Sequence, residues 1–497
     1  MELPASYHPS PLDEIVPPLR YAFILGFPIE FAHRDHALET LQEGYSRLLR
    51  ERPYLASDIV RDNNPDVRPG SLKLIIPNNP VNIKLDVADV SDSPAFRERS
   101  YASVREAKMP QSWLDPELLA PCVAGVATTT KMITGRVNWI NGGCLLTISI
   151  AHAALDAQGA FTVIKNWANL CQGSQSLSGL SRFPVGESRQ TEAKTATDLL
   201  RIQTIPSSRL PFEHLRLRPE LWNFLGLHFE DNLAPRASAP SLPTCIPAAA
   251  TAIAGSTATR MRTCIFSFSS QRSAALKATA TSLDGNDWIS TNDAYTAHIW
   301  TSLMRARFSD EDKALSISDV NKGTHRPLSS VYLAIDGRKL PGCGFVPSRI
   351  NNAVYCCKVQ LPLSTVLERD VLPTLAVAIR QQIEAVKSNQ DLINDANALA
   401  AAIPAVGRLT YVVTDFLDRD LVTTSWTALP FYDLDFGPGL GKPQFFRIPR
   451  GQYTGICCML PQRPNGDIEV IISAEENEMD RLLADTNFLK YAKLVCE

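Results

Sequence analysis

The chain has 497 residues, of which 45% are hydrophobic and 20% are charged, and its net charge at pH 7 is -3. This composition is typical of a globular protein with large hydrophobic cores, and the length exceeds that of one ordinary core, so we expect two or three domains. The near-neutral charge, with no long basic stripe or acidic tail, argues against nucleic acid or a charged membrane surface as a partner.

The lack of a recognisable targeting segment and the pattern of cysteines predict a soluble protein of the cytoplasm. A short apolar run at 21–27 follows acidic residues and prolines, without a basic region or a cleavage site, so we expect a strand there and no signal peptide. No run of about 18 apolar residues occurs, so we expect no transmembrane helix. The eleven cysteines lie scattered without CxxC spacing. That pattern favours free thiols in a reducing compartment over disulfides or a zinc site.

Periodicity predicts the elements of the first third of the chain. They are a strand at 21–28, a helix at 34–52 that ends before Pro53, two paired strands at 72–76 and 83–87, and a hairpin of strands 123–134 and 136–150 that turns at Gly135. Strands and helices alternate without a regular βαβ rhythm. We therefore expect mixed sheets with helices packed on them, not a doubly wound parallel sheet.

The segment 138–159 contains the first candidate for chemistry. The run after Gly142-Gly143 is almost wholly apolar, which suits a strand covered on both faces. His152 follows where this run stops, and Asp156 opens an amphipathic helix that closes near Gly173. A histidine at the exit of a buried strand has a fixed backbone and a ring that can reach a cleft, as a general base requires.

Two interpretations of this segment stay open on the residues alone. His152 is either a general base or a satisfied core or surface histidine. Asp156, four residues on, is expected to lock the local turn through a salt bridge or backbone hydrogen bonds, and not to touch substrate.

The character of the chain changes between about 174 and 260. This stretch is polar at first, then rich in arginine and proline, and finally dominated by Ala, Pro, Ser and Thr, which is typical of a long connection between two halves. The elements predicted beyond it are strands at 261–268, 330–336 and 353–360, helices at 270–279, 292–307 and 364–388, strand-like runs within 409–473, and a terminal helix at 475–492.

A second informative stretch, 425–443, is rich in glycine. A phosphate-binding loop would need a helix directly after the glycines, but Pro443 and a strand-like segment follow instead. We therefore expect a structural turn that holds a buried Asp435. A buried carboxylate needs a cationic partner, and Arg338 is one candidate among many.

Taken together, these segments resemble the BAHD acyl-CoA-dependent acyltransferases, within them the fungal branch of the trichothecene 3-O-acetyltransferase type. The motifs that carry the resemblance occur in order along most of the chain: the HxxxD of His152 and Asp156 preceded by Gly142-Gly143; Ser290-Thr291-Asn292-Asp293 through Trp300; Asp336-Gly337-Arg338 followed by Asn351-Asn352-Ala353-Val354; and Ser425-Trp426 through Asp435, Gly437 and Lys442-Pro443.

The chain departs from the family pattern at three positions. The family glycine after the aspartate is Ala157, with Gly159 two residues later. The tryptophan of the DFGWG motif is Pro438, and the usual second arginine after the Asp-Gly-Arg motif is Leu340. The role proposed in the family for that tryptophan, steadying the reacting carbonyl, is therefore unassigned here.

The resemblance implies an α/β fold of two chloramphenicol-acetyltransferase-like domains with mixed β-sheets and flanking helices. It implies an N-terminal domain at 1–185 with the HxxxD motif, a crossover linker at 186–260 and a C-terminal domain at 261–497 with the DFG-like motif. A channel between the domains would hold the histidine at its middle.

The resemblance also implies an activity. His152 would take the proton from a hydroxyl, less commonly an amine, of a hydrophobic secondary metabolite, which attacks the thioester of acyl-CoA, and of acetyl-CoA in particular, in a ternary complex. Acyl-CoA is then a co-substrate, and we expect no bound cofactor, no metal, no nucleic acid and no membrane partner, and a monomer.

The resemblance assigns two kinds of supporting residue. Asp156, Arg338, Asp435 and Gly437 would hold the fold of the site. Ser290, Thr291, Ser425 and Trp426 would lie near the pantetheine arm of CoA, although Ser290 and Thr291 are equally explained as the N-cap of the helix that follows them.

Two alternative functions remain at this point. One is a freestanding condensation-type domain that takes acyl groups from a carrier protein, but such domains carry a second histidine where this chain has Ala151. The other is a homologue that binds or shapes a ligand without acyl transfer, which the intact His152 and Asp156 disfavour and which Pro438 keeps open.

Overall fold

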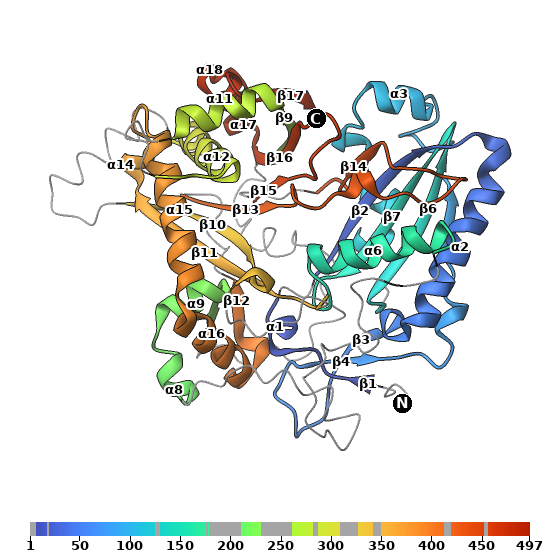
Figure 1. The fold of residues 1–497 in the computed structure, drawn as a ribbon, viewed down its shortest axis with the longest axis horizontal. Coiled ribbons are helices and arrows are strands. Elements are labelled where there is room, and N and C mark those ends of the chain that lie inside the picture. Colours follow the sequence, from blue (N-terminus) through green and yellow to red (C-terminus); the bar gives the residue numbers. More distant parts are fainter. Residues whose placement is uncertain are drawn as a thin grey trace.

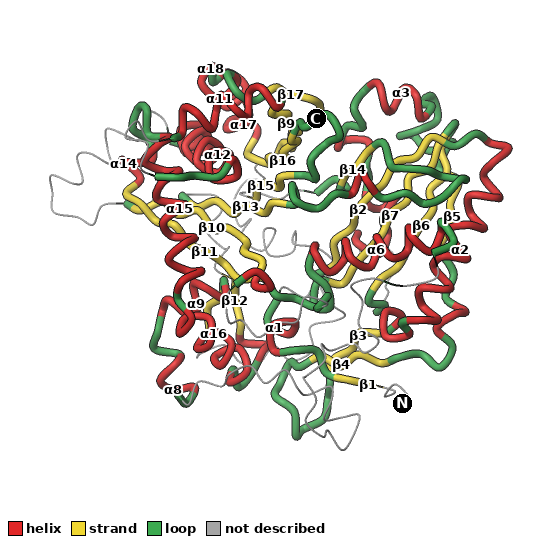
Figure 2. Tube along the Cα trace, viewed as in Figure 1, coloured by secondary structure: helices red, strands yellow, loops and turns green. Residues whose placement is uncertain are grey.

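The computed structural model describes residues 6–16, 19–124, 130–174, 177, 210–229, 261–281, 287–308, 327–340, 349–411, 419–451 and 456–497. These residues form two large β-sheets, one in each half of the molecule, and two small ones (Figure 1). Helices pack on both large sheets (Figure 2). Each large sheet mixes parallel and antiparallel neighbours. This confirms the predicted α/β arrangement of two halves with mixed sheets.

The first large sheet is built around the strand that precedes His152. Its order is β14 (Phe445–Arg447), β2 (Arg20–Pro28), β7 (Gly143–Ala151), β6 (Ile133–Ile140) and β5 (Asp86–Asp89). Every residue of β7 is buried. Leu146 packs in the core beneath helices α2 (Arg34–Glu51) and α6 (Ala157–Cys171), whereas Leu145 packs in a separate core beneath α3 (Tyr101–Glu106). The sequence correctly predicts a strand covered on both faces.

The hairpin that leads into β7 turns at a different place from the prediction. Strands β6 and β7 pair antiparallel from Ile140 with Gly143 onward, so the turn lies at Asn141-Gly142, where Gly142 has a φ of +75° that favours glycine. Gly135, the predicted turn, lies inside β6. A Cβ there would stand 2.6 Å from Leu85, so this glycine permits close packing and does not make a turn.

The strands predicted at 72–76 and 83–87 do not pair with each other. β4 (Leu72–Ile75) pairs with β3 (Asp58–Arg61) and β1 (Ser6–Tyr7), whereas β5 runs parallel to β6 in the large sheet. The 3₁₀ turn η3 (Pro80–Asn82) separates the two strands and sends them to different sheets. Neighbouring position in the sequence was therefore a wrong guide to pairing here.

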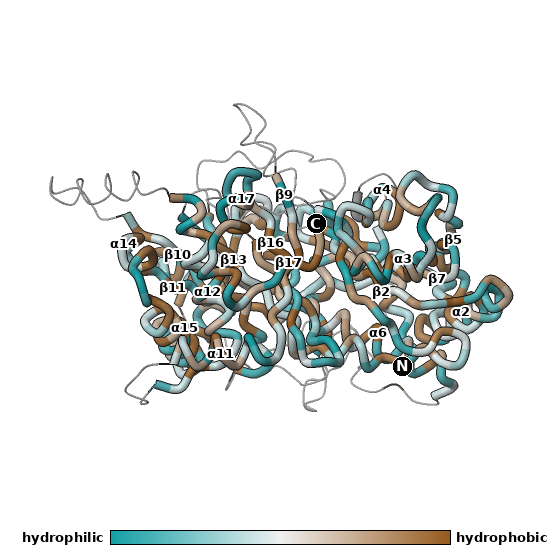
Figure 3. The backbone as a smooth tube through the Cα atoms, turned by 90° about the horizontal axis from the view of Figure 1, so that it is seen from above, coloured by the Kyte–Doolittle hydropathy of each residue, from teal (hydrophilic) through white to brown (hydrophobic). Residues whose placement is uncertain are grey.

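The second large sheet has seven strands, all from the C-terminal half of the chain. Its order is β11 (Val354–Pro362), β10 (Leu328–Asp336), β13 (Asp420–Ser425), β15 (Ile456–Met459), β16 (Ile468–Glu475), β9 (Met261–Phe268) and β17 (Lys493–Cys496). The helices that pack on it include α11 (Ser270–Ala280), α12 (Thr291–Arg307), α15 (Leu372–Ser388) and α17 (Glu476–Ala484). Hydrophobic stretches follow the strands through the middle of the molecule (Figure 3).

Two predicted helices of this half are interrupted. The 364–388 helix is α14 (Leu363–Val366) followed by α15, with Asp370 at a φ of +55° between them. The terminal helix is α17 followed by α18 (Thr486–Leu489). No helix among the described residues is long and apolar enough to cross a membrane.

The two halves contact each other through strand pairing as well as through the linker between them. Strand β14 belongs to the C-terminal segment, yet it pairs with β2 of the first sheet. Within the predicted linker 186–260, the described residues form α8 (Phe212–Leu215), α9 (Pro219–Leu225) and β8 (Leu227–Phe229). Helix α9 packs against α16 (Gln390–Ala402) and β11, and β8 pairs with β12 (Leu409–Tyr411). The parts of this linker before 210 and after 229 lie outside the described residues.

Candidate active site

His152 follows the last residue of β7, and its main chain is fixed on both sides. Its N–H donates to the carbonyl of Leu19 at 2.9 Å, and its own carbonyl accepts from Nδ2 of Asn352 at 2.7 Å. The half-buried imidazole lies edge-on to the ring of Tyr21, with ring centroids 5.3 Å apart. The histidine is therefore placed from three segments, β7, β2 and the loop before β11.

Burial sets the charge state of this imidazole. Desolvation lowers the pKa of His152 below its ordinary value, and its own backbone, Asp156, Asn352 and Asp13 oppose that shift only in part. The ring is thus neutral near neutral pH and can accept a proton. The main chain of His152 is held on both sides, and burial favours the neutral ring, which is the form that a general base requires.

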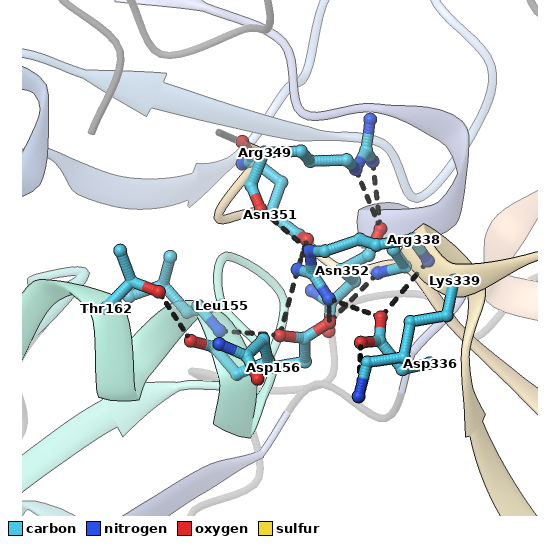
Figure 4. Close-up of polar contacts among 12 residues, drawn as sticks. Leu155, Asp156, Thr162, Asp336, Arg338, Lys339, Arg349, Asn351 and Asn352 are labelled. Atoms are coloured by element: carbon cyan, nitrogen blue, oxygen red, sulfur yellow. Dashed lines mark hydrogen bonds and ion pairs between the residues drawn. The ribbon is translucent and has the colours of Figure 1, made fainter. Parts of the chain in front are cut away.

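Asp156 lies at the start of α6, and its carboxylate is fully engaged (Figure 4). Oδ1 accepts from the N–H of Gly159 at 2.9 Å as the helix N-cap, and Oδ2 accepts from the N–H of Ala353 at 3.0 Å. The guanidinium of Arg338 pairs with both oxygens, each at 3.0 Å. With 2% of its surface exposed, Asp156 holds the loop by both means that the sequence suggested, a salt bridge and backbone hydrogen bonds.

Arg338 is the centre of this loop contact. It lies in η5 (Gly337–Lys339), directly after β10, and also donates to Asp336 at 3.0 Å. Its remaining N–H groups reach the main-chain carbonyls of Arg349 at 2.7 Å and Asn351 at 2.6 Å. The arginine therefore ties the segment after His152 to two loops of the other half (Figure 4).

The predicted burial of Asp435 is wrong, and Arg338, one candidate for its partner, pairs with Asp156 instead. Asp435 is half-buried, its Oδ1 accepts from the N–H of Gly437 at 2.9 Å, and its carbonyl accepts from Gln172 at 2.7 Å. Among the described residues it forms no ion pair, because a partly hydrated carboxylate needs no cation. The predicted turn is present: Gly437 has a φ of +87°, and a Cβ there would stand 2.8 Å from the carbonyl of Cys171 at the end of α6.

The glycine displaced from the family position has a clear steric role. A Cβ on Gly159 would lie 1.8 Å from the carbonyl oxygen of Ile350, so only glycine lets the first turn of α6 approach the loop at 349–353. Ala157, at the usual glycine position, is the first residue of the helix.

The four predicted CoA residues lie in two places. Ser290 caps α12: its hydroxyl accepts from the N–H of Asp293 at 3.2 Å, and the Asp293 carboxylate accepts from the N–H of Ser290 at 2.7 Å. The N-cap explanation is therefore confirmed. Thr291 is the first residue of α12. Ser425 ends β13, exposed. Trp426 follows and packs on Phe23 of β2, with ring centroids 5.3 Å apart.

Only one of these two places is connected to the histidine by contacts of the described residues. Phe23 also contacts Tyr21, at 5.4 Å between ring centroids, and Tyr21 contacts His152. An aromatic row therefore leads from Trp426 to the imidazole. The described contacts of Ser290 and Thr291 do not extend to His152.

Sequence reasoning missed one residue that contacts this region. Asp13, in the short helix α1 (Pro11–Glu14), is wholly buried and accepts two hydrogen bonds from Asn352. The pattern Ser10-x-x-Asp13 is a capping box and predicts a helix start, which the structure contains. No local pattern could show that this helix lies beside Asn352.

The fold and the site together define a two-lobed acyltransferase, and comparisons with known proteins agree. Residues 21–171 match the trichothecene 3-O-acetyltransferase-like N-terminal domain, and residues 227–489 match the Transferase family. An eremophilane O-acetyltransferase of Penicillium roqueforti is 34% identical over 484 residues, which covers 97% of each chain. The trichothecene 3-O-acetyltransferase of Fusarium sporotrichioides is 26% identical and covers 92% of this chain and 90% of its own.

Solved structures show the same fold. The crystal structure of F. graminearum TRI101 complexed with Coenzyme A and T-2 mycotoxin matches with a TM-score of 0.76 and 18% identity, over 99% of both chains. The chain therefore belongs to the BAHD acyl-CoA-dependent acyltransferase family, in its fungal trichothecene 3-O-acetyltransferase-like branch, as its motifs predict. It is an acyl-CoA-dependent O-acyltransferase.

Proposed function

We propose that His152 is the general base of an O-acetyl transfer from acetyl-CoA to a hydroxyl group of a hydrophobic secondary metabolite. The observation that carries this proposal is the placement of His152, whose main chain is held on both sides and whose pKa is lowered by burial, which favours the neutral form that can take a proton. Relatives named for eremophilane and trichothecene acceptors support a hydrophobic alcohol of that general kind.

The chemistry proceeds in a ternary complex without a covalent enzyme intermediate. The imidazole takes the hydroxyl proton as the oxygen forms a bond to the thioester carbonyl carbon. The carbon–sulfur bond then breaks, and the CoA thiolate leaves and receives the proton back from the imidazolium. A thiol with a pKa of about 8.5 leaves without strong acid assistance, so a single histidine is sufficient.

Asp156, Arg338, Asp435 and Gly437 have structural roles in this proposal. Asp156 and Arg338 hold the loop that follows His152, and Asp435 and Gly437 hold the end of α6. The full hydrogen bonding of the Asp156 carboxylate supports a role outside the chemical step.

We further propose that CoA contacts Ser290, Thr291, Ser425 and Trp426. The aromatic row between Trp426 and the imidazole supports this for the pantetheine end. For Ser290 and Thr291, the support is the motif alone, because capping already accounts for Ser290.

We propose that the enzyme works as a cytoplasmic monomer without a bound cofactor, with domains at 1–185 and 261–497 joined by the linker at 186–260. The cysteines of the described residues are all free, which supports a reducing compartment.

The test is a transfer assay with the purified protein. Acetyl-CoA and longer acyl-CoAs are incubated with a panel of terpenoid, polyketide and alkaloid alcohols, and thiol release and ester product are recorded. We expect His152→Ala to fold normally and to lose at least about 10²-fold in turnover, the lower end of what general base catalysis supplies. A folded His152→Ala variant that keeps most of its turnover would overturn the proposal.

A further inference from the structure

The short helix α1 lies between the two halves of the molecule (Figure 1), and both of its carboxylates are buried. They have different partners. Glu14 pairs with Arg68, whose guanidinium also donates to the carbonyl of Ala400 at 2.9 Å near the end of α16. Asp13 faces the loop before β11 instead. One helix thus carries two buried carboxyl groups with different partners.

The carboxylate of Asp13 is held in one orientation. Oδ2 accepts from the N–H of Ser10 at 3.0 Å and from its hydroxyl at 2.6 Å. The guanidinium of Arg349 stands 4.0 Å from the same oxygen and donates to the Ser10 hydroxyl at 2.7 Å. Oδ1 is left for Asn352, from which it accepts the main-chain N–H at 2.8 Å and the side-chain Nδ2 at 2.9 Å.

Asn352 transmits this orientation to the histidine. Its Nδ2 carries two N–H groups; it donates to Asp13 and also to the carbonyl of His152 at 2.7 Å. Only 1% of Asn352 is exposed, so water does not compete for these bonds. The contact falls just past the end of β7, where the N–H of His152 bonds to Leu19 and its carbonyl bonds to Asn352.

We propose that Asp13 is a positioning residue for His152, acting through the carboxamide of Asn352. The inference rests on the proposed function, since it assigns Asp13 a part in holding the base of that reaction. The carboxylate fixes the carboxamide, and the carboxamide fixes the carbonyl of the residue that carries the imidazole. Asp13 touches neither substrate nor the ring and is not itself a catalytic residue.

The charge of Asp13 has a second consequence for the imidazole. The titratable groups that face His152 are Asp156 on its own loop, Tyr21 on β2 and Asp13 on α1, and arginines stand behind both carboxylates. Burial is the main influence and lowers the pKa of His152, whereas the negative charges of Asp156 and Asp13 raise it. Removal of the Asp13 charge should therefore lower the pKa of His152 further.

The two acidic residues of α1 provide a matched pair of variants. Asp13→Ala and Glu14→Ala each remove a buried carboxylate from the same helix, so both should lower the melting temperature. Only Asp13→Ala should lower kcat, by about 10- to 100-fold, because a misplacement near 1 Å has an effect of that order. The KM for acyl-CoA should change little in either variant. Equal kcat values in the two variants would overturn the proposal.

A second measurement separates this proposal from the proposed function. If Asp13→Ala does not fold, Asp13→Asn keeps the side-chain shape and removes the charge, with Glu14→Gln as its control. NMR of ¹³C-labelled histidine follows the titration of His152, assigned by its loss in His152→Ala, and needs no turnover.

We expect the His152 titration to move to lower pH in Asp13→Asn and to stay in place in Glu14→Gln. If the His152 titration is unchanged in Asp13→Asn, the coupling of Asp13 to His152 is refuted, even if the enzyme is active. If the wild-type protein transfers no acyl group, but the His152 titration still moves in Asp13→Asn, the proposed function is refuted and the coupling of Asp13 to His152 stands.

Discussion

Replacement of Asp156 by alanine tests whether this aspartate holds the structure or takes part in the chemistry. The substitution removes a carboxylate that receives two hydrogen bonds from Arg338, at 3.0 Å each, and two from main-chain N–H groups. It leaves the guanidinium without its main counter-ion and leaves the first turn of α6 without a cap.

The magnitude follows from burial. The side chains of Asp156 and Arg338 are only 3% and 8% exposed, so water cannot replace the lost partner. Removal of one member of such a buried pair typically destabilises a protein by about 3–5 kcal/mol. The lost N-cap, worth about 1 kcal/mol alone, overlaps with this loss because the same carboxylate makes both contacts. We expect the free energy of unfolding to fall by about 3–5 kcal/mol.

The assay is urea unfolding and thermal melting of Asp156→Ala beside Asp435→Ala. Asp435 is the matched control, since its half-buried side chain makes one backbone hydrogen bond at 2.9 Å and no ion pair among the described residues. Its loss should cost only about 0.5–1.5 kcal/mol. Equal losses in the two variants would contradict the ion-pair argument. An unchanged stability of Asp156→Ala with a lost rate would show that the aspartate acts in the chemistry.

Three further predictions follow from burial and close contact. Because burial lowers the pKa of His152 and only the neutral ring accepts a proton, kcat/KM should be level at neutral pH and should fall only at a pH below the ordinary histidine pKa of about 6.5; a fall on acidification that already begins above that value would contradict this. Gly159→Ala should abolish soluble expression or strongly lower the melting temperature, since its Cβ would stand 1.8 Å from the Ile350 carbonyl, and a wild-type melting curve would refute the steric argument. Glu469→Gln should lower the free energy of unfolding, measured in urea, by about 3–5 kcal/mol. The reason is that Arg447, which is wholly buried and lies 2.7 Å from the Glu469 carboxylate, loses that negative charge. A loss under about 1 kcal/mol would contradict this prediction.

The sequence by itself determined the elements whose causes are local. The apolar run before His152 predicted a strand buried on both faces, and the Ser290 cap predicted where α12 begins. The order of motifs determined the family, and the position of His152 at a strand exit determined the candidate base. The strand, the helix cap and the candidate base each depend on residues within a few positions of one another, so a short window contains the signal; the family depends on several such windows in a fixed order along the chain.

Only the tertiary structure decided which distant segments meet. Arg338 pairs with Asp156, 182 residues away, and not with Asp435. Asp13 meets Asn352 across 339 residues, and β14 crosses from the second half to pair with β2 of the first sheet. A carboxylate or a strand edge can pair with any suitable partner that the chain brings near, and that choice depends on how whole faces pack. Composition and periodicity describe the faces, but only their packing selects the partners that hold the base in place.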